Sequence, residues 1–330
     1  MPKKINIFLS VIDNLWDIGF AAELIRSFDE LYPSHYFFDI WTDNLEKTEQ
    51  FFRANDNLRW TYQIQYISDI ANKEASISFL LFHHPIPDDY PKNRNELFLR
   101  IDYLSFDREW VIQHGNEHVD SRENQKIIEI IPSPQKEGGG LISPPKKLLS
   151  RSDIAWKYTL EQEKKWITIF SYKDTFENYI EFDEINDIEI LLLGTNSEYK
   201  KSFASNKNIH ELPFLSLIEF SSIIRESYSS IIRWEVSFIS TLQLETPFFW
   251  DMYKEIGGFY REQAHDFLKW YGADNAYEDI FYRLNGVKKW GIKISEMQNY
   301  FKEHEKKRFP WAKNLTRELQ KYIDKYHFSL

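Results

Sequence analysis

Apolar and polar positions follow two different periods along this chain, and the opening stretch shows both. Residues 5–12 form a nearly continuous apolar run, which is typical of a strand that is buried on both faces. The next apolar positions recur at helical spacing, at Ile18, Ala21, Ala22, Ile25 and Phe28. The pattern therefore predicts a buried strand that leads directly into an amphipathic helix.

The succession of strand and helix patterns continues through the first half of the chain. Residues 46–54 have a helical pattern. Short apolar runs predict further strands at residues 35–41, 78–82, 97–104 and 126–131. Strands separated by helical stretches predict a mostly parallel, doubly wound sheet.

The composition changes at residues 132–145, which hold four prolines and the triplet Gly138-Gly139-Gly140 in a chain with only 11 glycines. Proline and glycine at this density indicate a loop, a linker or both. We place the domain boundary near residue 152, which gives a first domain at residues 1–152 and a second at 153–310.

The second half restarts the alternation of strands and helices. Apolar runs predict strands at residues 166–172, 188–193, 209–214 and 247–250. Helical patterns occupy residues 216–226 and 235–244, with a β-branched segment between them that ends before Arg233. These elements predict a second Rossmann-like domain.

The tail of the chain, residues 311–330, has a helical pattern. Its apolar stripe follows the helix breaker Pro310 and consists of Leu315, Leu319, Tyr322, Ile323 and Tyr326. A final helix of this kind would pack back on the first domain. The predicted fold class is α/β, with two Rossmann-like domains facing a cleft, as in the glycosyltransferase B fold and in several other two-domain enzymes.

Composition sets further limits. A chain of 330 residues exceeds what a single hydrophobic core usually organises, which agrees with two domains. The formal net charge of −10, from 51 acidic and 41 basic residues, argues against binding to nucleic acid or an anionic membrane. The absence of cysteine excludes disulfides, thiolate metal sites and cysteine nucleophiles. With no pattern for a signal peptide or a transmembrane helix, we expect a cytoplasmic protein.

Two carboxylates, Asp13 and Asp17, lie at the first junction of strand and helix. In open α/β sheets, ligands bind outside the carboxyl ends of the strands, so this position favours a catalytic role. A structural role fits as well, because Asn14 is a good N-cap and Asp17 would close a variant capping box. The two roles do not exclude each other.

Residues 114–118 spell His-x-x-Glu-His, the inverted zinc-peptidase pattern. On a helix, His114 and His118 would share one face and could hold zinc. Gly115 and Asn116 are poor helix formers, however, so an ordinary polar loop is the preferred interpretation. We therefore expect no metal site.

The chain has neither a G-x-G-x-x-G nor a Walker A sequence, so a bound phosphate would have to be recognised without a glycine-rich loop. Arg233 precedes a predicted helix start, and Ser237 follows with a hydroxyl, a combination that suits a phosphate at a helix N-terminus. Tyr253 leaves the strand at residues 247–250 and is placed to reach a ligand. The alternative is a capped helix with a surface arginine.

Five blocks follow one another along the chain: Val11 to Asn14 with Asp17 to Gly19, Ile101 to Ser105 with Trp110, Gly139 to Leu141, Arg233 to Phe238, and Pro247 to Tyr253. In this order the blocks resemble the elongation factor P arginine rhamnosyltransferases (EarP). In the family they correspond to an N-terminal signature, the "LEYLS" block, the "TGGL" turn, the "RGEDSF" box and the block after it.

The resemblance implies an inverting glycosyltransferase of the B fold that transfers L-rhamnose from dTDP-β-L-rhamnose to an arginine of elongation factor P. It places the catalytic acids at Asp13, Asp17 and Glu235. It places donor-binding residues at Asn14, Tyr172, Phe214, Arg233, Ser237 and Tyr253, with Phe214 stacking on the thymine. The implied partners are elongation factor P and the nucleotide sugar, with no nucleic acid, membrane, cofactor or metal.

The chain departs from the family pattern chiefly around the donor. Leu15-Trp16 replaces Tyr-Gly, and Leu217 and Glu255 each replace a glutamine. Trp234 replaces a glycine and is large where the family leaves room, while Val236 replaces an acid and removes a polar contact. The retained acids favour an enzyme. The altered donor residues leave open a non-catalytic binding protein with the same fold, or a transferase that uses another nucleotide sugar.

Overall fold

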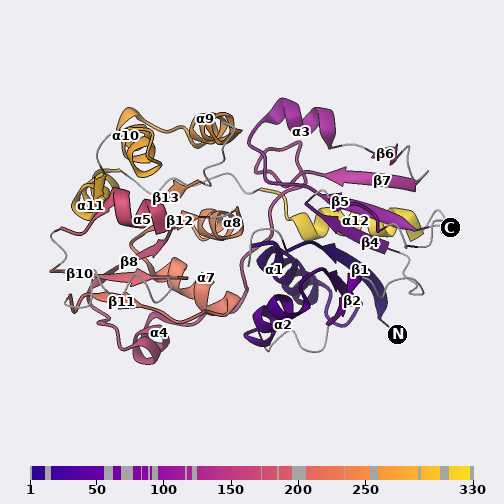
Figure 1. Cartoon of the computed structure of the whole chain (residues 1–330), viewed down its shortest axis with the longest axis horizontal. Helices are drawn as coiled ribbons and strands as arrows, with labels where there is room; N and C mark the ends of the chain where they lie inside the picture. The colour runs from indigo at the N-terminus through magenta and orange to yellow at the C-terminus, as the bar shows by residue number, and fades with distance from the viewer. Residues whose placement is uncertain are drawn as a thin grey trace. The chain divides into compact units, whose positions relative to one another are not determined.

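The computed structural model divides the chain into two compact units (Figure 1). Unit 1 comprises residues 1–144 and 311–330, and unit 2 comprises residues 145–310. The structure describes residues 2–11, 16–55, 62–67, 77–82, 84–87, 90, 96–115, 117–120, 125–171, 173–183, 186–194, 206–233, 235–252, 259–288, 291–304 and 312–327. Each unit is built around a parallel sheet, as the alternating pattern predicted.

The sheet of unit 1 has seven described strands in the order β3-β2-β1-β4-β5-β7-β6. All neighbours pair in parallel except β6, which is antiparallel to β7. The strands are β1 (Lys3–Leu9), β2 (Tyr36–Thr42), β3 (Tyr62–Tyr66), β4 (Ile77–Leu81), β5 (Leu97–Ile101), β6 (Glu117–Asp120) and β7 (Gln125–Ile130). The order reverses direction after β1, as in doubly wound folds.

The described helices of unit 1 are α1 (Trp16–Leu31), α2 (Leu45–Arg53), α3 (Arg108–His114) and α12 (Leu315–His327). The apolar stripe of α1 is fully buried, and the Phe28 ring lies 5.7 Å from that of Phe38 and 5.8 Å from that of Phe79. Burial of this stripe against the sheet is what the helical spacing predicted.

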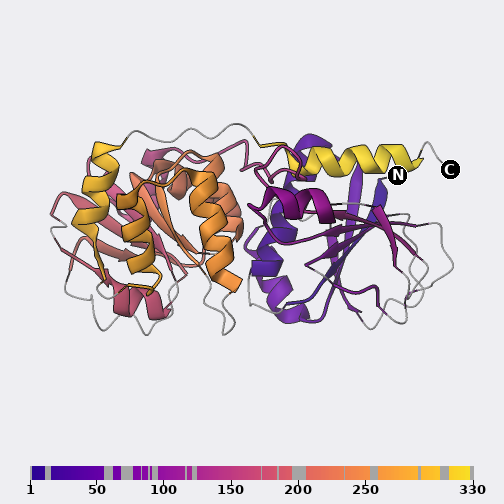
Figure 2. The ribbon, with the colours of Figure 1, turned by 90° about the horizontal axis from the view of Figure 1, so that it is seen from above.

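The tail helix α12 lies along unit 1 in both ribbon views (Figures 1 and 2). It contacts α1 and β5, and the Thr316 hydroxyl donates to the Ser27 hydroxyl at 2.7 Å. Three residues of its apolar stripe, Leu315, Leu319 and Ile323, have no exposed surface. The chain therefore returns to unit 1 after completing unit 2.

The glycine triplet follows a turn at residues 136–137 within unit 1, and Gly140 pairs back with Ser133. Gly140 has φ +84°, and a Cβ there would collide with the carbonyl of Lys313. This close approach allows the amide of Leu141 to donate to the Lys313 carbonyl at 2.7 Å, and the amide of Leu315 donates back to Leu141 at 3.0 Å. Glycine is needed here because the returning chain pairs with this segment.

Unit 2 has a five-stranded, wholly parallel sheet in the order β11-β10-β8-β12-β13. Its strands are β8 (Lys165–Phe170), β10 (Ile188–Leu192), β11 (Ile209–Glu211), β12 (Ser229–Arg233) and β13 (Phe248–Asp251), and a separate pair joins β9 (Ile180–Glu181) to β14 (Ile292–Lys293). The helices are α4 (Arg151–Tyr158), α5 (Lys173–Tyr179), α7 (Leu217–Glu226), α8 (Glu235–Gln243), α9 (Phe259–Tyr271), α10 (Asn275–Leu284) and α11 (Ile294–Glu303). None of the described helices has both the length and the apolar character needed to cross a membrane.

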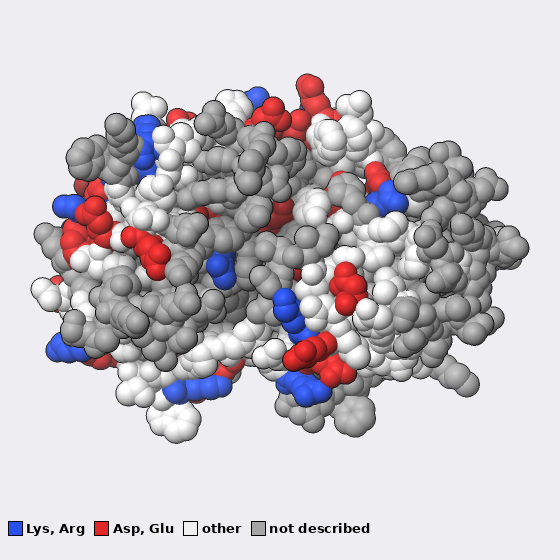
Figure 3. Space-filling view, viewed as in Figure 1, with Lys and Arg blue, Asp and Glu red and all other residues white. Residues whose placement is uncertain are grey.

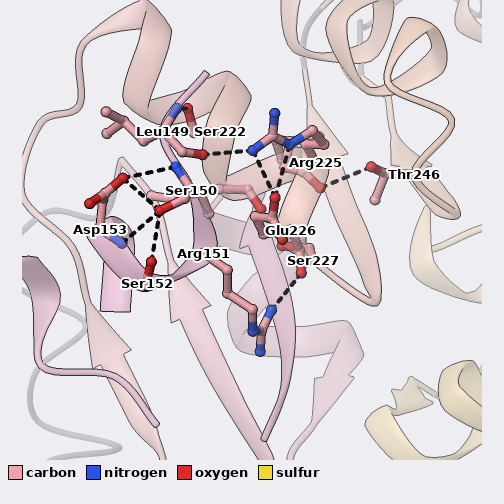
Figure 4. Close-up of polar contacts among 12 residues, drawn as sticks. Leu149, Ser150, Arg151, Ser152, Asp153, Ser222, Arg225, Glu226, Ser227 and Thr246 are labelled. Carbon is pink, nitrogen blue, oxygen red and sulfur yellow. Dashed lines mark hydrogen bonds and ion pairs between the residues drawn. The ribbon is translucent and has the colours of Figure 1, made fainter. Parts of the chain in front are cut away.

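The boundary between the units lies at residues 144 and 145, somewhat before the predicted position near residue 152. Figure 4 shows the reason: the segment before α4 is bonded to α7. The amide of Leu149 donates to the Ser222 hydroxyl at 2.9 Å, and Arg225 donates to the Leu149 carbonyl at 2.6 Å. Arg151 adds a bond to the carbonyl of Glu226 at 2.8 Å. These contacts anchor residues 149–151 in unit 2.

Most predicted strands are found within a few residues of their expected ends. The short strands β9 and β14 of unit 2 were not predicted, and in the unit 1 sheet β3 and β6 were not predicted. Both lie at the two edges of the unit 1 sheet. The side chains of β3 are half-exposed or exposed and include two glutamines, and β6 has the sequence Glu-His-Val-Asp. An edge strand needs less apolar surface than a central one, so neither gives the continuous apolar run on which the other predictions depended.

We expect Leu319→Ala to lower the free energy of unfolding of unit 1 by about 2–5 kcal/mol, because it leaves a cavity beneath α12. Urea-induced unfolding measures the change. Lys321→Ala on the same helix is the control; its side chain is 70% exposed, and we expect a change within about 0.5 kcal/mol. Equal effects of the two variants would contradict the packing of α12 described above.

Candidate active site

The carboxyl edge of the unit 1 sheet carries Asp17. This residue lies in the first turn of α1, which follows β1, and only 2% of it is exposed. Just after β1, the amide of Val11 donates to Oδ1 of Asp43 at 2.8 Å, which ties the end of β1 to the end of β2. A carboxylate in the first turn of a helix is stabilised by the helix dipole. The structure thus places an ionisable group where open α/β sheets bind their ligands.

Asp13 and Asn14 lie outside the described residues, as do Tyr172 and Tyr253. Their assignments from the sequence remain predictions. The N-cap role of Asn14 at the start of α1 also remains a prediction.

In unit 2, Arg233 ends β12 at the carboxyl edge of the five-stranded sheet. Its Nη1 donates to the carbonyl of Ser171 at 2.9 Å. Its guanidinium carbon lies 4.6 Å from the ring centroid of Phe170, which gives a cation–π contact. Arg233 is therefore held against the end of β8 by a hydrogen bond and a cation–π contact.

Gly194, just beyond β10, leaves room for this arrangement. It has φ +62°, and a Cβ at this position would collide with the ring of Phe170 and lie 3.5 Å from Nη2 of Arg233. Any larger residue would displace the ring on which the guanidinium rests. Three neighbouring strands, β10, β8 and β12, thus shape the surroundings of one cation.

Glu235 and Ser237 lie in the first turn of α8, the helix that follows β12. Glu235 is half-buried and Ser237 is buried. The Ser237 hydroxyl donates to the carbonyl of Arg233, so its proton already has an acceptor within the chain. Backbone amides in the first turn of a helix point along the helix axis, and together with the helix dipole they suit a phosphate.

Phe214 lies in the loop between β11 and α7, and 51% of it is exposed. The helix that follows is well anchored, because Ser216 and Glu219 form a capping box at the start of α7. A large aromatic ring that is half-exposed beside a rigid helix start is suited to stacking on a flat base.

Sequence reasoning missed a polar cluster under Arg233. The buried carboxylate of Asp251 at the end of β13 accepts from the hydroxyl of Ser171 at 2.6 Å and from that of Thr175 at 2.9 Å. These residues are 76 to 80 positions apart in sequence, so no local motif connects them. The available signal was a polar residue at the end of each of two predicted buried strands, since Ser171 is the second-last residue of the predicted strand 166–172 and Asp251 directly follows the predicted strand 247–250.

The His-x-x-Glu-His segment does not form a helix. Helix α3 ends at His114, and Glu117 and His118 belong to strand β6. The ring of His114 stacks on Trp110 with centroids 3.7 Å apart. The zinc-peptidase interpretation is therefore wrong, because Gly115 ends the helix before the second histidine. Among the residues that the structure describes, no group of three or more His, Asp or Glu side chains could hold a metal ion.

Charged side chains are mixed on the face shown in Figure 3. The described Lys, Arg, Asp and Glu residues are scattered there, with both signs close together.

Comparisons with known proteins agree with the fold. The sequence profile of the elongation factor P (EF-P) rhamnosyltransferase EarP matches residues 5–327. A solved structure described as the structural basis for EarP-mediated arginine glycosylation of EF-P matches with a TM-score of 0.50 at 13% identity, over 98% of this chain and 94% of that one. MnaA from S. aureus, solved with UDP, matches with a TM-score of 0.51 at 10% identity, over 100% of this chain and 98% of that one. No curated protein sequence matches the chain.

The two structural matches show the shared fold, with two Rossmann-like domains as in glycosyltransferases of the B fold. The profile match covers nearly the whole chain, including both units and the tail helix. The chain belongs to the EarP family of elongation factor P rhamnosyltransferases and is a glycosyltransferase.

Proposed function

We propose that this enzyme transfers L-rhamnose from dTDP-β-L-rhamnose to an arginine of elongation factor P, with inversion at the sugar carbon. The observation that carries the proposal is the family match over residues 5–327. The geometry of unit 2 supports it, because Arg233 is held in place beside the first turn of α8.

The donor would bind to unit 2. Arg233 offers a guanidinium fork that matches phosphate oxygens, and the α8 amides add neutral donors. Phe214 would stack on the thymine, since half of its surface is exposed. We assign further donor contacts to Asn14, Tyr172, Ser237 and Tyr253 on the family resemblance.

The acceptor in this reaction is the guanidinium of an arginine, which must be made nucleophilic. A guanidinium is protonated below a pKa of about 12, so its nitrogen is a poor nucleophile. Carboxylates bind it through paired hydrogen bonds and can orient it. We assign the general base to Asp17, which would accept the proton as the C–N bond forms, and we assign guanidinium binding to Asp13 and Glu235.

The bond between the sugar carbon and the diphosphate oxygen breaks as the C–N bond forms, so negative charge builds on dTDP. Arg233, Tyr253 and the amides near Ser237 would stabilise this charge. With these groups the proposed reaction includes no metal ion and no cofactor.

The direct test is intact-protein mass spectrometry of the organism's own elongation factor P after incubation with the enzyme and dTDP-β-L-rhamnose. We expect a gain of one deoxyhexose that fragmentation assigns to an arginine. If dTDP binds but no sugar is transferred, the proposed sugar or acceptor is wrong. If dTDP does not bind, the donor assignment is wrong.

We expect Asp17→Asn to reduce the rate of transfer by at least about 100-fold, because the amide cannot accept the proton, while the affinity for dTDP stays within about twofold. Single-turnover mass spectrometry and calorimetry measure the two quantities. Asp29→Asn, at the other end of α1, is the matched control and should keep full activity. Undiminished transfer by the Asp17 variant would exclude Asp17 as the base.

We expect Arg233→Ala to weaken dTDP binding by at least about tenfold, because a charge-assisted contact to the diphosphate is lost. Thymidine, which has no phosphate, should bind equally to both proteins. Arg225→Ala in the same unit is the control for loss of an arginine away from the site. Equal dTDP affinity of the Arg233 variant and the wild type would contradict the phosphate contact.

A further inference from the structure

Asp251 is a buried acid that the proposed reaction does not use. It is the last residue of β13, and none of its surface is exposed. Burying a carboxylate is unfavourable unless it is well hydrogen-bonded. Its contacts therefore need an explanation.

Both carboxylate oxygens of Asp251 contact the same segment of chain. Oδ2 accepts from the hydroxyl of Ser171 at 2.6 Å, and Oδ1 accepts from the hydroxyl of Thr175 at 2.9 Å. Ser171 directly follows β8, and Thr175 lies in the first turn of α5. Asp251 thus connects the end of β13 to the junction between β8 and α5.

Ser171 links this carboxylate to the proposed phosphate-binding arginine. Its side chain donates to Asp251, while its carbonyl accepts from Nη1 of Arg233 at 2.9 Å. The neighbouring residue, Phe170, provides the ring beneath the same guanidinium. Any shift of Ser171 would therefore move both supports of Arg233. Asp251 and Arg233 also lie opposite each other in the parallel pairing of β13 with β12.

The end of β13 has a separate structural anchor. Asn285, after α10, accepts from the amide of Met252 at 2.9 Å and donates to the carbonyl of Trp250 at 3.0 Å. These two bonds flank Asp251 and fix the backbone of the strand end to α10. The Asp251 carboxylate bonds to the Ser171 and Thr175 hydroxyls instead, and of these two residues Ser171 is the one whose carbonyl supports Arg233.

We propose that Asp251 is a positioning residue for donor binding, which acts through Ser171 to hold Arg233 toward the diphosphate of the nucleotide sugar. The inference rests on the proposed function, since it takes Arg233 as a contact to the donor. Asp251 itself would not touch the donor or the acceptor.

Two hydroxyl variants give the sharpest test, because each removes one bond to the same carboxylate. We expect Ser171→Ala to weaken dTDP binding about tenfold, since it frees the segment that supports Arg233. Thr175→Val removes the other bond and should leave the affinity within about twofold. Thymidine should bind all three proteins equally, because it does not reach Arg233. Equal losses in the two variants, or loss of thymidine binding in Ser171→Ala, would overturn the proposal.

Asp251→Asn tests the carboxylate itself. We expect about tenfold weaker dTDP binding in the wild-type background, and no further loss when the change is added to Arg233→Ala. A purely structural role would lower the affinity in both backgrounds. Asp183 is a similar carboxylate in the same unit, which accepts from the Ser295 hydroxyl at 2.6 Å. Asp183→Asn is therefore the matched control and should bind dTDP normally.

These measurements distinguish failure of the positioning role of Asp251 from failure of the proposed dTDP donor. If the wild type binds dTDP and the Ser171 and Asp251 variants bind it equally well, the positioning role is wrong while the proposed donor stands. If the wild type does not bind dTDP, the donor proposal is wrong, and the positioning role that depends on it is overturned as well.

Discussion

Parallel pairing of strands is the constraint on which the rest of this structure depends. In each unit the paired strands end at one edge of a sheet, so residues far apart in sequence meet there. In unit 2 the pairing of β8 with β12 brings Phe170 and Ser171 to the guanidinium of Arg233. In unit 1 the pairing of β1 with β2 brings Val11 to Asp43, beside the start of the helix that carries Asp17. The chemistry proposed for this enzyme uses groups at these edges.

The fold could be predicted well because its central elements have strong local signals. Fully buried strands such as β4 and β10 are continuous apolar runs, and α1 has a clean helical stripe. The edge strands β3 and β6 lack such runs and could not be predicted from them. The histidine pattern at residues 114–118 was set aside because its spacing has meaning only on a helix, and α3 does end at His114, with Gly115 as its C-cap.

The candidate site could be predicted only in part. Arg233 and Ser237 were identified because they stand next to a helix start, which is a local signal. Asp251 was not, because its role depends on Ser171 and Thr175, which only the folded sheet brings close. An isolated aspartate after an apolar run does not reveal its partners. A polar cluster of this kind can be identified only when the strand order of the sheet is known.

The return of the chain to unit 1 has a consequence for synthesis on the ribosome. Unit 2 is continuous in sequence, whereas unit 1 needs α12, whose buried stripe is translated after all of unit 2. The nascent chain can therefore complete unit 2 before unit 1, although most of unit 1 is made first. Until α12 docks, the apolar surfaces of α1 and β5 that it covers stay open to chaperones or to other nascent chains.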